Sequence, residues 1–422
     1  KLAYYLSLGH RDEELIFAHL TFTDQKTSVP QKTVGDLQME FQLTRLDTIE
    51  KTEGAIRYQF ADKNELTFHL DPYHSDCVRY VDYLLAGNMI KREYYGACKL
   101  ATEYFQYGRI LRRTYHNQDG RVTFEELRLG GNWLYKLGPE ILTSHTEVMR
   151  RFLLQLSLKE EDLILLDRAS RMDFARPLLE KDDPAKLAMV FHSEHEFENG
   201  QLNYEYYYVF KYAKHFDYFI TATETQKEVL EQTLAKQEYH DIPIYSIPVG
   251  HLEGLTESQG DRSPYSVITA SRLDPRKRID LAIRVVAQAH KHLPALQFDI
   301  YGKGGEEDNL RHLIQELEAQ DYIHLRGHAD LKRIYPHYQA YLTASQWETF
   351  GLTLMEAAGA GLALLGFDAR YGNPTFIKEG ENGYLVPYSG KRPEEELVKE
   401  LADKLVQLFN RNLEPFHQAS YD

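Results

Sequence analysis

Apolar runs without polar alternation recur from about residue 150 to the end of the chain, and segments with helical periodicity separate them. Strands of this kind are usually buried on both faces, and helical connections join strands that run parallel. The first runs that read as strands are DLILLDR, LAMVFHSEH, YFITAT and IYSIPVG. EVMRRFLLQLSL and TQKEVLEQTLAK read as helices. This part of the chain is therefore predicted to be an α/β fold with a parallel sheet.

A polar segment containing Gly, Pro and Ser, residues 251–264, is predicted to be a linker. Beyond it the alternation of strands and helices begins again with YSVITAS and runs to the helix PEEELVKELADKLVQLFNR. Two doubly wound domains joined by a linker imply a cleft that faces the carboxyl ends of their strands.

The first 150 residues differ, because short β-prone runs alternate there with turns. IRYQF, ELTFHL, RILRRTYH and RVTFEEL read as strands, and HNQDG reads as the hairpin turn between the last two. We expect an antiparallel meander with one or two helices near residues 90–106, serving as an accessory or interface module. A chain of 422 residues is long enough for two or three domains. The expected domains are residues 1–150, residues 151–255 and residues 256–422.

Charge and cysteine content exclude several classes of protein. The formal net charge is −15, from 49 basic and 64 acidic residues, which argues against nucleic acid as the main partner. Cys77 and Cys98 lack C-x-x-C spacing, so neither a disulfide framework nor a zinc site is expected, and a reducing compartment fits. No apolar run approaches the roughly 20 residues of a membrane span, and no secretory signal opens the chain.

The stretch WETFGLTLME places two carboxylates around a turn. AYLTAS is read as a strand entering this stretch, Gly351 permits a tight turn, and a short helix follows. Glu348 then lies on the loop and Glu356 about one turn inside the helix, so both can face one ligand at the helix N-terminus. That terminus suits a phosphate, and two carboxylates suit the hydroxyl groups of a sugar or ribose. The alternative is that Glu356 only complements the helix dipole and Glu348 is merely exposed.

A second constellation, TASRLDPRKRID, begins where the first strand after the linker ends. Arg272 and Lys277 lie five residues apart across a turn that contains Pro275. Two cations at the carboxyl end of a sheet strand would neutralise a diphosphate without a metal ion. The alternative is a solvated basic turn.

A glycine-rich turn and a following loop complete the candidate site in the second α/β part. Gly302, Gly304 and Gly305 in DIYGKGGEEDNL permit the backbone to approach a base or a phosphate closely, although such a turn can also serve packing alone. His328, in RGH after the next strand, is expected to border the same pocket.

Two histidines follow a buried strand in the first α/β part. In VFHSEHEFENG, His192 and His195 are expected to face the cleft as polar groups. With Glu194 between them they also raise the question of a metal site, but the spacing is not that of the H-E-x-x-H helix. The aromatic segment Asn203–Tyr212 either lines an acceptor groove or packs a helix, and its spacing favours packing.

Three of these segments together resemble the retaining glycosyltransferases of family 4, which have the GT-B fold. WETFGLTLMEAAGAGLALLGFD resembles their E-x7-E region, SRLDPRKRID their phosphate-binding Arg and Lys segment, and IYGKGGEEDNLRHLI their nucleotide loop. A narrower similarity joins FHSEHEFEN, FITATETQ, SIPVGHLEGL and DARYGNPTFIKEGENGYLVP to the GtfA-type glycosyltransferases of accessory Sec systems. The fold class implied is α/β, GT-B. Two Rossmann-like doubly wound domains face a cleft, and a mostly antiparallel β-meander is inserted into the first.

The resemblance also implies roles for matching residues. Glu348 approaches the donor sugar, and Glu356 holds the ribose hydroxyls. Arg272 and Lys277 neutralise the departing diphosphate. His192 contacts the donor sugar from the first domain, and His195 is the alternative. Further donor contacts are expected from Gly302, Gly304, His328, Phe350, Gly351, Leu352 and Thr353.

Enzymes of this kind move N-acetylglucosamine from UDP-GlcNAc to Ser or Thr of a serine-rich repeat adhesin in the bacterial cytoplasm. A non-catalytic GtfB-type partner subunit binds the substrate. We expect the same donor, acceptor, partner and location here, without metal or cofactor and with at most peripheral membrane association. Two alternatives are a wall teichoic acid glycosyltransferase of the same fold and a non-catalytic binding subunit, which would have a broken donor site. The sequence leaves glucose and N-acetylglucosamine open as donor sugars.

Members of this family begin with a strand and a glycine-rich loop, and a C-terminal helix crosses back to the first domain. Neither segment is recognised between Lys1 and Asp422. Both ends of the protein are therefore expected to extend further.

Overall fold

The computed structural model describes residues 16, 18–25, 30–43, 48–52, 54–60, 63–169, 172–180, 185–197, 199–239, 241–256 and 262–422. The chain forms two compact units. The first comprises Lys1–Asp162 and Arg171–Ala185, and the second comprises Leu163–Ser170 and Lys186–Asp422. The three expected domains, with boundaries after residues 150 and 255, stay a prediction.

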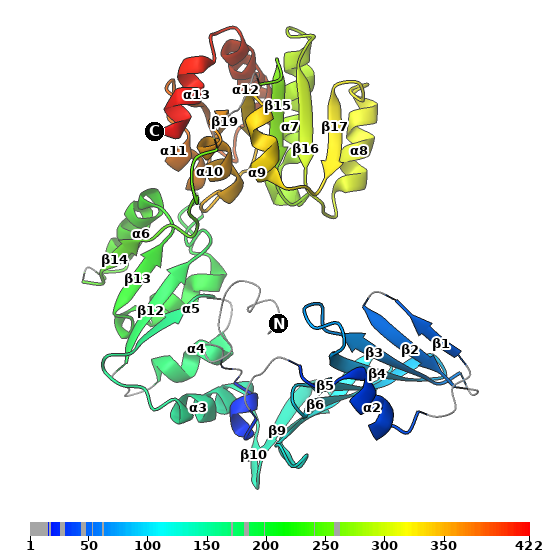
Figure 1. Ribbon diagram of the computed structural model, residues 1–422. Coiled ribbons are helices and arrows are strands. Elements are labelled where there is room, and N and C mark those ends of the chain that lie inside the picture. The colour runs from blue at the N-terminus through cyan, green and yellow to red at the C-terminus, as the bar shows by residue number, and fades with distance from the viewer. Residues whose placement is uncertain are drawn as a thin grey trace. The chain divides into compact units, whose positions relative to one another are not determined.

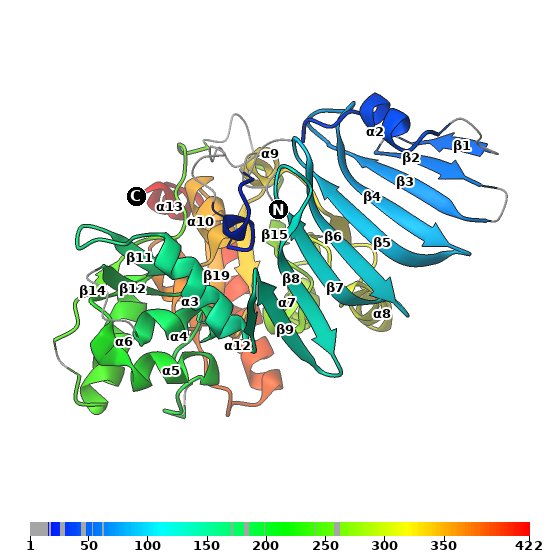
Figure 2. The ribbon, with the colours of Figure 1, turned by 90° about the horizontal axis from the view of Figure 1, so that it is seen from below.

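The first unit contains a ten-stranded antiparallel sheet whose strands follow one another in chain order (Figures 1 and 2). Its strands are β1 (Thr48–Lys51), β2 (Ala55–Gln59), β3 (Glu65–Leu70), β4 (Val78–Leu85), β5 (Asn88–Tyr95), β6 (Lys99–Gln106), β7 (Arg109–His116), β8 (Val122–Leu129), β9 (Asn132–Leu137) and β10 (Glu140–Leu142). Its helices are η2 (Leu20–Phe22), α2 (Val34–Glu40), α3 (His145–Gln155) and α4 (Met172–Leu179). The predicted meander is confirmed.

The helix expected near residues 90–106 is wrong, because this segment forms the strands β5 and β6. Its Lys, Arg and Glu residues favour helices when taken alone, but the cross-strand pairs decide the outcome. Arg92 of β5 binds Asp82 of β4 with an Nε–Oδ1 distance of 2.5 Å, and Tyr94 donates to Glu103 of β6 at 2.9 Å. These contacts exist only when the strands lie side by side.

The second unit begins with a four-stranded parallel sheet in the order β11-β12-β13-β14. Its strands are β11 (Leu163–Leu166), β12 (Lys186–Phe191), β13 (Tyr218–Thr221) and β14 (Ile244–Ser246). Its helical segments are η3 (Tyr204–Tyr206), α5 (Tyr207–Lys211), η4 (Ala213–His215) and α6 (Glu224–Lys236). In the aromatic segment, Tyr206, Tyr208 and Phe210 are buried, which confirms the packing interpretation for them, while Tyr204 and Tyr207 are exposed.

A six-stranded parallel sheet completes the second unit, in the order β17-β16-β15-β18-β19-β20. Its strands are β15 (Ser266–Ala270), β16 (Gln297–Tyr301), β17 (Ile323–Gly327), β18 (Ala340–Thr343), β19 (Ala363–Asp368) and β20 (Gly383–Pro387). Its helical segments are η5 (Pro275–Lys277), α7 (Ile279–His290), α8 (Glu307–Glu316), α9 (Leu331–Ile334), η6 (Tyr335–His337), α10 (Leu352–Gly359), α11 (Gly372–Phe376), α12 (Glu394–Phe409) and α13 (Glu414–Tyr421).

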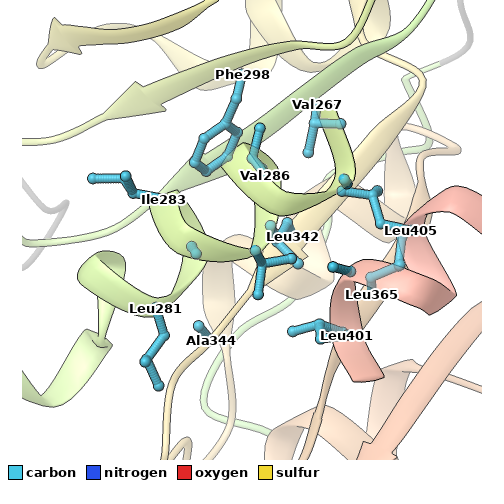
Figure 3. Close-up of a cluster of buried hydrophobic side chains, with 14 of the residues drawn as sticks. Val267, Leu281, Ile283, Val286, Phe298, Leu342, Ala344, Leu365, Leu401 and Leu405 are labelled. Atoms are coloured by element: carbon cyan, nitrogen blue, oxygen red, sulfur yellow. The ribbon is translucent and has the colours of Figure 1, made fainter. Parts of the chain in front are cut away.

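Helices cover both faces of this sheet, which explains why its strands β15, β18 and β19 lack polar alternation. Val267 packs with residues of α7 and α12, and Figure 3 shows it in one cluster with Val286 of α7 and Leu405 of α12. The next residue, Ile268, points to the opposite face and packs with Leu354 of α10. The expected doubly wound sheet is confirmed.

The strand order reverses between β15 and β18, which are neighbours in the sheet. In doubly wound sheets the ligand crevice lies at the carboxyl ends of the strands, at this point of reversal. The topology therefore predicts that the ligand site lies at the two loops that follow β15 and β18. None of the helices in the described part of the chain has the length and apolar character that crossing a bilayer would require.

Candidate functional site

The loop after β15 presents two cations. Arg272 is exposed directly beyond the strand, and Lys277 ends the 3-10 turn η5. Asp274 caps this turn by accepting a hydrogen bond from the backbone N–H of Arg276 at 3.0 Å, and it also pairs with the Arg276 side chain. Arg276 lowers the pKa of Asp274 below its usual range. Arg276 is thus engaged locally, as is Arg278, whereas Arg272 and Lys277 remain for other partners.

The loop after β18 meets the same turn. The Lys277 Nζ lies 2.5 Å from Glu348 Oε2, and the two side chains are 22% and 20% exposed. The backbone of Glu348 is held in place by the loop after β19, because its N–H donates to the Arg370 carbonyl at 3.1 Å and its carbonyl accepts from Tyr371 at 2.6 Å. The structure therefore brings together two residues that are 71 positions apart in the chain.

Gly351 turns the chain from this loop into α10. Its φ of 89° lies in the left-handed region that favours glycine, and Leu352 begins the helix. Phe350 is buried, whereas Leu352 is 47% exposed. Thr353 is held by two tyrosines, since Tyr335 donates to its carbonyl at 3.2 Å and the Tyr341 hydroxyl lies 2.9 Å from its Oγ1. The predicted strand–turn–helix arrangement is confirmed.

Glu356 lies in the second turn of α10, half-buried, and burial raises the pKa of its carboxyl. It lines a pocket of about 470 Å³ together with Tyr335 and Lys332. Segment 251–256, which precedes the second α/β domain, contributes His251, Leu252, Glu253, Gly254 and Thr256 to the lining. Partial burial thus disfavours the ionised form of this carboxyl, and hydrogen bonds to a ligand would offset that effect.

The glycine-rich turn after β16 packs against the chain's own backbone. A Cβ at Gly302 would lie 1.8 Å from the Ser271 carbonyl oxygen, and one at Gly304 would lie 2.2 Å from the Leu273 carbonyl oxygen. A Cβ at Gly305 would have no heavy atom within 4 Å. The first two glycines thus hold the segment that carries Arg272, and any donor contact by this turn stays a prediction. His328, which follows β17, is exposed.

His192 follows β12 and pairs with a residue that no motif marked. Its Nε2 lies 2.6 Å from Oδ1 of Asp167, which follows the neighbouring strand β11. The available signal was the position of an acid directly after the buried-type run LILL. His195, the alternative, is fully buried, and its ring stacks on Tyr371 at a centroid distance of 6.2 Å. Burial lowers the pKa of His195 to about 4, so the geometry favours His192 as the ligand-facing ring.

Among the described residues, no group of three or more His, Cys, Asp or Glu side chains could hold a metal ion. The positive charges at the site are the side chains of Arg272 and Lys277. The chemistry that this arrangement supports is the neutralisation of an anionic leaving group beside the carboxylate of Glu348.

Two family models match the chain. Residues 257–412 match the model for glycosyl transferases group 1, which spans the six-stranded sheet. Residues 48–139 match the model for the GtfA extended beta-sheet domain, which spans most of the meander.

Individual proteins are similar over nearly the whole chain. The UDP-N-acetylglucosamine--peptide N-acetylglucosaminyltransferase GtfA subunit of Streptococcus gordonii is 40% identical over 417 residues, covering 96% of this chain and 82% of that protein. The structure of the pneumococcal O-GlcNAc transferase GtfA in complex with UDP and GlcNAc has a TM-score of 0.86 and 38% identity, covering 99% of this chain and 84% of that one. A GtfA/B complex gives a TM-score of 0.85 at 40% identity, with 99% and 85% covered. The expected GT-B fold with an added antiparallel sheet is confirmed.

Proposed function

Because the chain belongs to the GtfA-type glycosyltransferases, we propose that it transfers N-acetylglucosamine from UDP-GlcNAc to Ser or Thr hydroxyls of a polypeptide, with retention at the anomeric carbon. One observation carries the proposal. Lys277 and Glu348 meet in the loops after β15 and β18, where the strand order reverses. Arg272 lies in the same loop as Lys277.

Arg272 and Lys277 act at the step in which negative charge develops on the diphosphate. As the bond between the sugar and the diphosphate breaks, negative charge grows on the leaving group, and Arg272 and Lys277 stabilise it. Lys277 is paired with Glu348 in the free chain. In the complex the diphosphate replaces Glu348 as the partner of Lys277, and Glu348 becomes available to the donor sugar.

Glu356 and its pocket serve the nucleoside half of the donor. Its carboxylate is half-buried with a raised pKa, and hydrogen bonds from two ribose hydroxyls would offset that cost. The pocket of about 470 Å³ is within the range of small-molecule sites, which is roughly 300–1,000 Å³. The ribose therefore donates hydrogen bonds to a carboxylate whose ionised form burial disfavours.

The acceptor, the partner and the location form the finer part of the proposal. The acceptor is a serine-rich repeat adhesin, and a non-catalytic GtfB-type subunit presents it, a pairing supported by the similarity to the GtfA/B complex. The place of action is the bacterial cytoplasm, a reducing compartment that suits the free thiols of Cys77 and Cys98. The reaction requires neither metal nor cofactor.

The first experiment measures UDP release from UDP-GlcNAc and from UDP-glucose, each with a Ser/Thr-rich repeat peptide, with and without a GtfB-type subunit. Peptide-dependent release from UDP-GlcNAc supports the proposal, and enhancement by the subunit supports the two-subunit assembly. Release that requires poly(ribitol phosphate) in place of peptide would assign the chain to the teichoic acid enzymes instead. Absence of UDP binding would assign it to the non-catalytic subunits.

Two variants test the roles of the charged residues. Arg272→Ala and Glu348→Gln are each expected to lower kcat by about 10²-fold or more, the usual effect of removing one preorganised charge-stabilising group. Arg276→Ala is the matched control, because Arg276 is exposed on the same turn and pairs locally with Asp274. Turnover unchanged in the first two variants would contradict the assignment.

A further inference from the structure

The contact between His192 and Asp167 has no counterpart among the donor-site motifs. We propose that Asp167 is a positioning residue, which orients the imidazole of His192 so that its Nδ1 faces a hydroxyl of the donor sugar. The inference rests on the proposed glycosyl transfer and assigns a role to a residue that has none so far.

The topology of the four-stranded sheet brings the two residues together. Asp167 comes directly after β11 and His192 directly after β12, and these neighbouring strands run parallel with Leu166 opposite Met189. The carboxyl ends of parallel strands meet at one edge of the sheet. The Nε2–Oδ1 distance of 2.6 Å is that of a strong hydrogen bond to a charged group.

The backbone of His192 is held by other residues. Its N–H and that of Ser193 both donate to the Tyr206 hydroxyl at 3.1 Å, and Gln226 donates to the Ser193 carbonyl at 3.1 Å. Tyr206 is 2% exposed and Gln226 is fully buried. These contacts fix the main chain of the loop. The hydrogen bond to Asp167 acts on the imidazole ring itself.

The consequence is a defined tautomer. When Nε2–H donates to Asp167, the neutral ring keeps its lone pair on Nδ1, which can accept a hydrogen bond from a sugar hydroxyl. The side chains of His192 and Asp167 are 33% and 67% exposed, so a ligand can reach the ring. Arg168 approaches the other carboxylate oxygen of Asp167 at 3.7 Å, which leaves Oδ1 to the imidazole.

A double-mutant cycle tests whether Asp167 acts through His192. A hydrogen bond to a charged group contributes about 1.5–3 kcal/mol, so Asp167→Ala is expected to lower kcat/KM for UDP-GlcNAc by about ten- to hundredfold. In a His192→Ala background the same change is expected to have less than about a twofold effect, because the ring is absent. Losses that multiply in the double variant would overturn the proposal.

Three further measurements separate positioning from a structural effect. UDP lacks the sugar, so its Kd for Asp167→Ala should stay within about twofold of the parent value, whereas a disturbed fold would weaken it. Asp167→Glu should recover part of the turnover. Asp241→Ala is the matched control, because Asp241 is exposed just before β14, at the amino-terminal edge of the same sheet, and should leave turnover unchanged.

An activity-independent measurement separates failure of this inference from failure of the proposed function. The ¹⁵N chemical shifts of the His192 ring, assigned by comparison with His192→Ala, report which nitrogen carries the proton. The inference requires the proton on Nε2 in the parent chain and loss of that preference in Asp167→Ala. A ring without a preferred tautomer in the parent chain would overturn the inference even if sugar transfer is found. Absence of transfer together with the expected shifts would overturn the proposed function alone.

Discussion

The glycine-rich turn after β16 offers a comparison between two adjacent glycines. A Cβ at Gly304 would lie 2.2 Å from the carbonyl oxygen and 2.6 Å from the carbonyl carbon of Leu273, whereas one at Gly305 would meet nothing within 4 Å. The two segments are joined by hydrogen bonds, with Leu273 N–H donating to the Lys303 carbonyl at 3.1 Å and Glu306 N–H donating to the Leu273 carbonyl at 3.2 Å. We therefore expect Gly304→Ala and Gly305→Ala to differ sharply.

The magnitude follows from the overlap. Carbon atoms in contact lie about 3.5–4.0 Å apart, so the Leu273 backbone must move by roughly 1 Å to admit the new methyl group. Such overpacking typically costs about 1–3 kcal/mol of unfolding free energy. Gly305→Ala is expected to gain about 0.4–1 kcal/mol, because it restricts the unfolded chain and meets no obstacle. The two variants should differ in melting temperature by roughly 5–10 °C.

Thermal unfolding followed by circular dichroism and UDP binding measured by calorimetry form the assay. Gly304→Ala should lower the melting temperature and weaken UDP binding together, because displacement of Leu273 carries Arg272 with it. Gly305→Ala should leave UDP binding unchanged. The reasoning is refuted if Gly305→Ala abolishes UDP binding at an unchanged melting temperature while Gly304→Ala changes neither quantity. In that case the ligand, and not the Leu273 backbone, would be the group that requires glycine in this turn.

Three further predictions concern buried charge. Burial raises the folded-state pKa of Glu356 above its ordinary value of 4.5, so its charged form destabilises the free protein at pH 7. Glu356→Gln should therefore raise the melting temperature at pH 7 while weakening UDP binding, and this gain in melting temperature should vanish below pH 4.5. An equal gain at all pH values would contradict the prediction. The folded-state pKa of His195, about 4 against an ordinary 6.5, predicts that the chain loses about 3 kcal/mol of stability as pH falls through that window, and His195→Phe should flatten the loss in pH-dependent unfolding. The guanidinium of Arg262 donates to the carbonyls of Tyr338 and Ala360 at 2.8 and 2.7 Å. Arg262→Met should therefore lower the unfolding free energy, measured by urea denaturation, by about 3 kcal/mol or more. A stability within error of the parent would show that water replaces these hydrogen bonds.

Local patterns predicted most elements of the second unit, most clearly β15, β18 and β19, which are buried on both faces and therefore read as continuous apolar runs. Val267 and Ile268 illustrate this, since they are adjacent and pack against opposite layers of helices. The error near residues 90–106 has the opposite cause. Those strands bury salt bridges and tyrosines rather than apolar side chains, and the pairing of Arg92 with Asp82 is invisible until the strands are aligned.

The candidate site divides in the same way. Five residues could be selected from the sequence because each belongs to a motif that follows a predicted strand: Arg272, Lys277, Glu348, Glu356 and His192. Their roles stay predictions. Asp167 was missed because a lone acid after a strand is common, and only its hydrogen bond to His192 distinguishes it.

Residue types and periodicity thus sufficed for the α/β class, the meander and the candidate chemistry, because these depend on interactions between residues near one another in the chain. The order β17-β16-β15-β18-β19-β20 required the tertiary structure, because strand neighbours are chosen by the packing of distant segments. That order places β15 beside β18, and it lets Lys277 reach Glu348 across 71 positions. The same packing places Gly302 and Gly304 against the carbonyl oxygens of Ser271 and Leu273. Which atoms a side chain at a glycine would meet depends on the tertiary structure, so the sequence alone does not show it.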